Sequence, residues 1–276
     1  MINFYNSIEG QGEDNMEVII GLVIGFAALL IAFIEEGGAL GSLVAPTAAM
    51  IVLGGTFAAV IIGAPGKDIK RLPKIFKVLF STRKSKTVEL ILYFKELSFK
   101  TRKNGLLSIE SEISADPNID PFIKKGLQMV VDGVEGQIVR DILELQMDMT
   151  AERHKAGAAM FEAAGGFSPT MGIIGTVMGL VNILGNLSDP NSLGPMIATA
   201  FIATLYGVAT ANIAWLPMAS KLKIMDKQET NERELIVEAI LCIQEGVNPN
   251  TIVEKLKGFL DPKELADLEQ QDKKVE

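Results

Sequence analysis

Residues 163–188 read AAGGFSPTMGIIGTVMGLVNILGNLS, and residues 190–220 read PNSLGPMIATAFIATLYGVATANIAWLPMAS. Neither stretch contains Asp, Glu, Lys, Arg or His, and only Asp189 separates them. A helix needs about 20 predominantly apolar residues to cross the hydrocarbon core of a bilayer. Each stretch is therefore long enough to cross once, and together they predict a membrane-spanning hairpin.

Two more uncharged stretches lie near the N-terminus, at residues 18–34 and 37–66, with Glu35 and Glu36 between them. The alternative is a soluble protein with buried helices, in which apolar residues would be dispersed at helical spacing. Two uninterrupted uncharged stretches of roughly 30 residues argue against that alternative. The sequence predicts four transmembrane helices.

The basic residues predict the topology. All 26 lie in two segments, 17 within residues 67–155 and 9 within residues 221–274. The predicted hairpin turns carry only acidic side chains. Because basic loops stay on the cytoplasmic side, we expect both segments to be cytoplasmic and both hairpin turns to lie outside. Four crossings then place the N-terminus in the cytoplasm as well.

Both basic segments show helical periodicity, interrupted by turn residues such as those at Asn104-Gly105 and Asn248-Pro249. We find no strand-like alternation, so the predicted fold is all-α, with a helical cytoplasmic domain formed by the loop and the C-terminal tail. The polar residues after Pro262 are expected to be loosely held. The predicted divisions are an N-terminal cytoplasmic segment 1–15, helices one and two in 16–66, a cytoplasmic loop 67–162, helices three and four in 163–220, and a C-terminal tail 221–276.

Helices three and four each carry small or hydroxyl residues along one face. Such faces let helices approach closely and form hydrogen bonds across their interface. Two interpretations are compatible with this pattern. The faces could serve ordinary helix packing, or they could line a pore or a binding site for a partner helix. The residues are Pro169, Gly172, Thr176, Gly179 and Ile183 in helix three, and Thr204, Gly207, Val208 and Ala211 in helix four.

Pro169 and Pro217 lie near the inner ends of these two helices. Proline lacks an N–H group and leaves a carbonyl free four residues earlier in a helix. At membrane depth such carbonyls are tolerated where they face a cavity or neighbouring protein, although either proline could equally shape a helix end.

The predicted spans lack any titratable acid or base. A self-sufficient pump needs such a group inside the membrane, so a second polypeptide must supply it if this chain moves ions. His154 and Cys242 are single and without ligand-like neighbours, so we expect no metal or cofactor. No protease, P-loop or hydrolase motif is present, and a net charge of −8 suggests no nucleic-acid partner.

Residues 166–181, GFSPTMGIIGTVMGLV, resemble the third-helix signature of the MotA/TolQ/ExbB family. Residues 197–221 resemble its fourth-helix signature, and the similarity reaches most of the chain beyond residue 15. TolQ and ExbB proteins have three crossings with the main loop after the first. Four crossings with the loop after the second favour flagellar stator proteins of the MotA type, including the sodium-type PomA branch. Arg102, Gly105 and Glu110 match the charged loop pattern of that group.

The resemblance implies a homopentamer in the bacterial inner membrane, around a dimer of a MotB-type single-helix partner that supplies a transmembrane aspartate. It assigns contact with the rotor protein FliG to Arg102, Lys103 and Glu110. Pro169 and Pro217 would couple ion passage to movement, and Thr176 and Thr204 would line the pathway. The ion is a proton or sodium, with the Thr176 hydroxyl favouring sodium. A TolQ/ExbB-type unit that energises envelope or import processes, and a non-conducting membrane scaffold, are the alternative functions.

Overall fold

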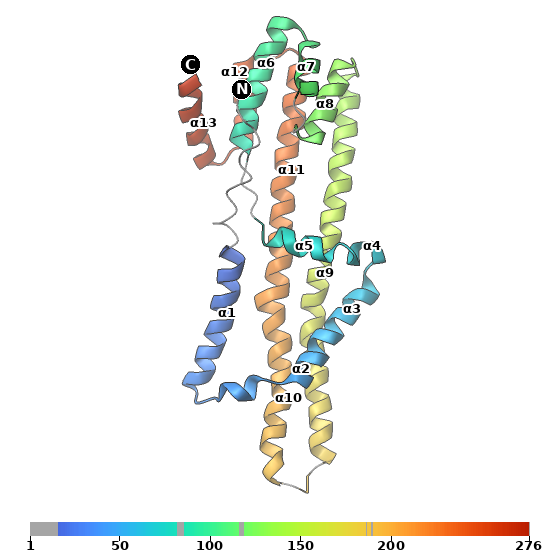
Figure 1. The fold of residues 1–276 in the computed structure, drawn as a ribbon, viewed down its shortest axis with the longest axis vertical. Coiled ribbons are helices and arrows are strands. Elements are labelled where there is room, and N and C mark those ends of the chain that lie inside the picture. Colours follow the sequence, from blue (N-terminus) through green and yellow to red (C-terminus); the bar gives the residue numbers. More distant parts are fainter. Residues whose placement is uncertain (1–15, 82–85, 116–118, 186, 189, 276) are drawn as a thin grey trace. The chain divides into compact units, whose positions relative to one another are not determined.

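The computed structural model describes residues 16–81, 86–115, 119–185, 187–188 and 190–275. The predicted N-terminal segment 1–15 lies outside this range. The described residues form helices and connecting turns, with no strand among them (Figure 1), which confirms the all-α prediction. In chain order the elements are α1 (Met16–Glu35), η2 (Leu40–Leu43), α2 (Pro46–Ala49), η3 (Met50–Gly54), α3 (Gly55–Gly63), α4 (Gly66–Ile69), α5 (Leu72–Leu79), α6 (Thr87–Asn104), α7 (Ser108–Ala115), α8 (Pro121–Val131), α9 (Gly136–Gly185), α10 (Pro190–Thr210), η4 (Ala211–Trp215), α11 (Leu216–Gln244), α12 (Pro249–Leu256), η5 (Lys257–Phe259) and α13 (Pro262–Val275).

The chain divides into two compact units, each built from two separate segments. The membrane unit comprises the described residues of Gln11–Thr82 and His154–Ile224, and the polar unit those of Arg83–Arg153 and Met225–Glu276. Helices α4 and α5, which lie in the predicted cytoplasmic loop 67–162 except for Gly66, pack with the membrane unit.

The membrane unit contains the apolar parts of four helical segments that are long and apolar enough to cross a membrane, as predicted. Helix α1 is the first, and η2 to α3 together form the second. The third and fourth apolar stretches belong to longer helical runs that also contribute polar residues to the other unit.

The polar unit has its own apolar core. Amphipathic helices α6, α8, α9, α11 and α12 all contribute side chains to it, because their apolar residues recur at three- and four-residue intervals. Phe94, Leu127, Leu143, Ile240 and Ile252 are fully buried there.

Turn residues end and begin these helices as the sequence indicates. Gly105 follows the last turn of α6 with φ +83°, a conformation that favours glycine. Asp120 caps α8 by accepting a hydrogen bond from the Phe122 N–H at 2.7 Å. Asn248 caps α12 in the same way, accepting from the Asn250 N–H at 2.9 Å.

The expectation of a loosely held C-terminus is wrong for the described residues, because Pro262–Val275 forms α13. Asp261 accepts hydrogen bonds from the Lys263 and Glu264 N–H groups at 2.9 and 2.8 Å, and the Glu264 carboxylate accepts one from the Asp261 N–H at 3.1 Å. This reciprocal cap provides hydrogen-bond acceptors for backbone N–H groups at the start of the helix. Leu268, 1% exposed, anchors the helix to the core of the polar unit.

Candidate functional site

Helices α9 and α10 meet backbone to backbone at two glycines. A Cβ on Gly207 would lie 2.5 Å from the Ser168 carbonyl oxygen and 3.0 Å from the Gly172 Cα. A Cβ on Gly172 would lie 2.8 Å from the Ala203 carbonyl oxygen. No side chain fits between the helices here, so this glycine contact fixes which faces of α9 and α10 meet.

Threonine hydroxyls bridge the same interface one turn away. Oγ1 of Thr176 lies 2.5 Å from Oγ1 of Thr204, 2.9 Å from the Ala200 carbonyl oxygen and 3.2 Å from that of Gly172. Both threonines are half-buried. Thr176 and Thr204, which the sequence placed on the small faces of two different helices, are thus direct neighbours.

A second hydroxyl pair continues the interface. Ser168, fully buried, lies with its Oγ 2.8 Å from Oγ1 of Thr210, which donates to the Tyr206 carbonyl at 2.7 Å. Sequence reasoning missed this pair, although Ser168 precedes Gly172 and Thr176 at four-residue spacing and so shares their helix face. The Tyr206 hydroxyl in turn donates to the Leu43 carbonyl, which ties α10 to the start of the second span.

These groups limit the chemistry of the interface. Hydroxyl and carbonyl oxygens can replace water around a cation, but none of them exchanges a proton near neutral pH. Within residues 163–188 and 190–220 the sequence provides no carboxylate, amine or imidazole. A partner must therefore supply any titratable group that acts here.

The two prolines have different surroundings. Pro169 lies within the continuous helix α9 and is half-buried, whereas Pro217 is exposed at the second position of α11. The residues just before Pro217 form the π-helical turn η4, in which the Leu216 N–H reaches back five residues to the Ala211 carbonyl. Such wide turns within helices occur often at functional sites.

The predicted rotor-contact residues lie in the polar unit. Arg102 and Lys103 are exposed in the last turn of α6, and Glu110 is exposed in the first turn of α7. Among the described residues none of the three forms an ion pair. Their charges are therefore available to an external partner.

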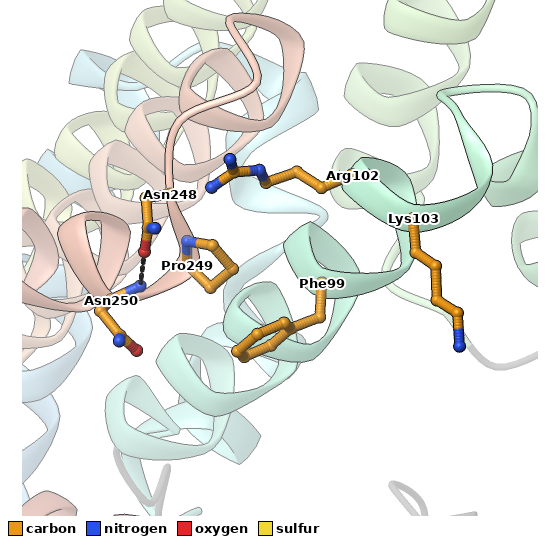
Figure 2. A pocket seen from close by; sticks show the side chains of 6 residues that line it. All are labelled: Phe99, Arg102, Lys103, Asn248, Pro249 and Asn250. Atoms are coloured by element: carbon orange, nitrogen blue, oxygen red, sulfur yellow. Dashed lines mark hydrogen bonds between the residues drawn. The ribbon is translucent and has the colours of Figure 1, made fainter.

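Arg102 and Lys103 line a cleft of about 330 Å³, which Glu110 does not line. Figure 2 shows Arg102 directed toward the start of α12 and Lys103 directed away from it. Phe99, 55% exposed, and the segment Asn248–Asn250 complete the lining. Phe99 could have been found from the sequence, because it lies three positions before Arg102 and so on the same side of the helix. The contribution of α12 could not, because the fold brings that distant segment beside α6.

The four apolar helices and their uncharged interface define a multi-pass membrane protein that offers neutral oxygen atoms but no carboxylate, amine or imidazole in residues 163–188 and 190–220. Residues 19–105 match the family model described as Motility protein A N-terminal, and residues 114–235 match that of the MotA/TolQ/ExbB proton channel family. Motility protein A from Bacillus subtilis is 39% identical over 89% of this chain and 91% of its own length. The chain belongs to the MotA/TolQ/ExbB family.

Two further relatives are similar over nearly their whole length. Chemotaxis protein PomA from Vibrio alginolyticus is 36% identical, over 90% of this chain and 96% of its own. A chain in the structure of the flagellar MotAB stator complex from Bacillus subtilis has a TM-score of 0.84 and 38% identity, covering 90% of this chain and 98% of that one.

Proposed function

We propose that this chain is the ion-conducting stator subunit of a bacterial flagellar motor. The observation that carries this proposal is the likeness, at a TM-score of 0.84, to a chain of a flagellar stator complex. The match of residues 19–105 to the Motility protein A model favours the motor over envelope or import processes, because that match includes the first two spans and α6.

The partner is a MotB-type protein with one transmembrane helix and an aspartate within it. The uncharged interface between α9 and α10 supports this assignment, since a carboxylate at membrane depth must come from another chain. The solved structures of similar chains are structures of MotAB, in which the chain is accompanied by a second protein.

The subunit acts as a homopentamer around a partner dimer in the bacterial inner membrane, with both termini in the cytoplasm. Exposed apolar side chains support association with lipid and with neighbouring subunits. On α9 they include Val177 and Val181, and on α10 Phe201 and Leu205.

Ions pass along the interface that contains Thr176 and Thr204, and Pro169 and Pro217 couple the passage to helix movement. The π-helical turn before Pro217 supports a coupling role, because such turns within helices occur often at functional sites. Sodium is favoured over the proton, since a hydroxyl oxygen can replace part of the hydration shell of sodium.

The rotor protein FliG binds at Arg102, Lys103 and Glu110. Their exposure and lack of ion pairs among the described residues support this assignment. The cleft beside Arg102 adds an apolar contact at Phe99 for the same partner.

Complementation tests the function. In a motile bacterium that lacks its own stator subunit, expression of this chain together with its neighbouring partner gene should restore rotation of tethered cells. Expression of the chain without the partner should not. If the pair assembles in the membrane and rotation stays absent, while uptake or envelope integrity is restored in a TolQ or ExbB deletion, the motor assignment is wrong.

A further inference from the structure

Helices α4 and α5 follow directly after a membrane span. Helix α3 ends at Gly63, and α4 begins at Gly66. Figure 1 shows α5 lying across α9 and α11 rather than along them. A helix that crosses spanning helices at the end of a span lies along the membrane surface.

Four lysines lie along this segment at intervals of three and four residues. The backbone stays right-handed helical through the junction at Lys70 and Arg71, so the intervals keep the lysines near one face. All four are exposed, and among the described residues none forms an ion pair. They are Lys67, Lys70, Lys74 and Lys77, called the lysine stripe below.

The apolar side of α5 is already occupied by the membrane unit. Leu79 is fully buried, and Phe76 packs on Phe161 with ring centroids 5.1 Å apart. Ile75 packs against α9 at Gly157, where an added Cβ would lie 3.0 Å from its Cδ1. Helix α5 is therefore held by its apolar face, and its lysines, Lys74 and Lys77, stay exposed.

The one acidic residue of the segment does not compete for the lysines. Asp68 is buried, with 7% exposure, and its carboxylate pairs with Arg71 at 3.3 Å. Within the part of the chain that the structure describes, the segment thus presents four lysines without an ion-pair partner beside the end of a span.

We propose that the lysine stripe binds the headgroups of anionic phospholipids, which surround the membrane unit at this surface. Basic side chains near a membrane surface attract anionic lipids, and several such residues act together. The positive-inside tendency explains basic residues on this side of the membrane, but it does not require them to form one exposed stripe beside a neutralised acid. This proposal does not depend on the proposed function.

Trp215 makes the test possible, because it is the only tryptophan of the chain and packs in a cluster with Leu72 and Ile75. The full-length chain is reconstituted in phosphatidylcholine nanodiscs that contain a small fraction of pyrene-labelled phosphatidylglycerol or, in parallel, of equally labelled phosphatidylcholine. Energy transfer from Trp215 to pyrene measures how often each lipid lies beside α5.

We expect stronger transfer to the anionic lipid in the unchanged protein. The ratio of the two transfers should fall to about one when all four lysines are changed to glutamine, and toward one at high ionic strength. The matched control changes four exposed lysines of the polar unit to glutamine, which alters net charge equally, and should keep the preference. These control positions are Lys124, Lys125, Lys227 and Lys263.

A ratio of one in the unchanged protein, or an equal loss in the control, overturns the proposal. A stripe variant that keeps its lipid preference also overturns the proposal, whether or not its oligomeric state in gel filtration changes. If the fourfold variant does not fold, the pair Lys74→Gln and Lys77→Gln replaces it. That pair should lose part of the preference, and the arginine versions of both positions should retain it.

Discussion

At Gly207 a single methyl group is enough to disturb the membrane unit. Gly207→Ala places a Cβ 2.5 Å from the Ser168 carbonyl oxygen and 3.0 Å from the Gly172 Cα, and backbone atoms cannot rotate away. We expect a loss of about 1–3 kcal/mol in stability, the usual result of overpacking. Thermal unfolding of the purified protein, followed by circular dichroism, measures it.

Gly166→Ala in α9 is the matched control, since no atom lies within 4 Å of its added Cβ. Alanine is favoured over glycine within a helix by about 1 kcal/mol, so this variant should unfold at the same or a higher temperature. Equal melting temperatures for the two variants would contradict the close approach of α9 and α10.

Thr176 allows the ion assignment to be tested. Thr176→Val keeps the side-chain shape but removes the oxygen that faces Thr204 and the Ala200 carbonyl. If sodium is the coupling ion, the sodium concentration for half-maximal swimming speed at fixed pH should rise about fivefold, the effect of losing about 1 kcal/mol. Thr176→Ser should stay near the original value. Swimming speed that does not depend on sodium in the unchanged protein would exclude sodium as the ion.

At the level of elements, one carboxylate joins three helices of the polar unit. Glu238 of α11 accepts from Arg140 of α9 and Lys255 of α12, both at 2.6 Å. These groups lie outside the apolar spans. Partial burial acts to raise the pKa of Glu238, but the hydrogen bonds from Lys255 and Arg140 outweigh it, so the pKa lies below its ordinary value. Glu238 in turn raises the pKa of Lys255.

The lowered pKa predicts how this junction responds to acid. A carboxylate with a lower pKa in the folded state stabilises that state above its unfolded pKa, and the stabilisation is lost as the pH falls through the folded pKa. Glu238→Gln should therefore cost about 1–2 kcal/mol at pH 7, between the values for exposed and buried pairs. The difference from the unchanged protein should shrink only at acidic pH below the ordinary carboxyl value. Urea unfolding at several pH values measures it.

Glu144→Gln is the control for this junction. Glu144 is more exposed and lies farther from Arg140, at 3.4 Å, so its loss should cost less. A pH-independent cost of Glu238→Gln would indicate that the amide disturbs packing rather than charge.

The helices could be predicted from the sequence where local signals agree. Uncharged stretches of sufficient length predicted the spans, and the turn at Asn248-Pro249 predicted a break between helices that the structure places at the start of α12. The π-helical turn η4 could not be predicted, because its residues Ala211–Trp215 continue the same uncharged apolar pattern as the α-helices on either side. Helix α13 was missed because its stability comes from a cap and one buried residue, Leu268, in an otherwise polar segment.

The candidate site was predicted in part. The predicted small faces of helices three and four include Gly172 and Gly207, which meet in the structure and leave no space for a side chain. Val208, placed on the same face, is 45% exposed instead, because a helix face defined by spacing alone is broader than the actual contact.

For the molecule as a whole, the uncharged stretches 18–34, 37–66, 163–188 and 190–220 carry no ionic side chain, and the exposed charges lie in the segments between and after them. Arg102→Glu together with Glu110→Lys reverses two exposed charges without removing any ion pair among the described residues. If FliG binds here, the double variant should assemble normally but lose most of its torque, measured by the rotation of tethered cells. Reversal of matching charges on FliG should restore part of it.

Lys124→Glu together with Glu234→Lys provides a control of equal charge change at exposed polar-unit positions outside the cleft lining. This control should rotate at nearly normal speed. Normal rotation of the Arg102 and Glu110 variant would show that the rotor contact lies elsewhere.

Cys242 has a practical consequence for the study of this protein. It is the only cysteine in the sequence, it is 2% exposed, and burial raises the pKa of its thiol, which leaves little reactive thiolate at neutral pH. A cysteine introduced at an exposed position such as Lys103 would then be the one thiol that a maleimide dye or cross-linker reaches readily. Site-specific labels can thus be attached to the native sequence without first removing a cysteine from it.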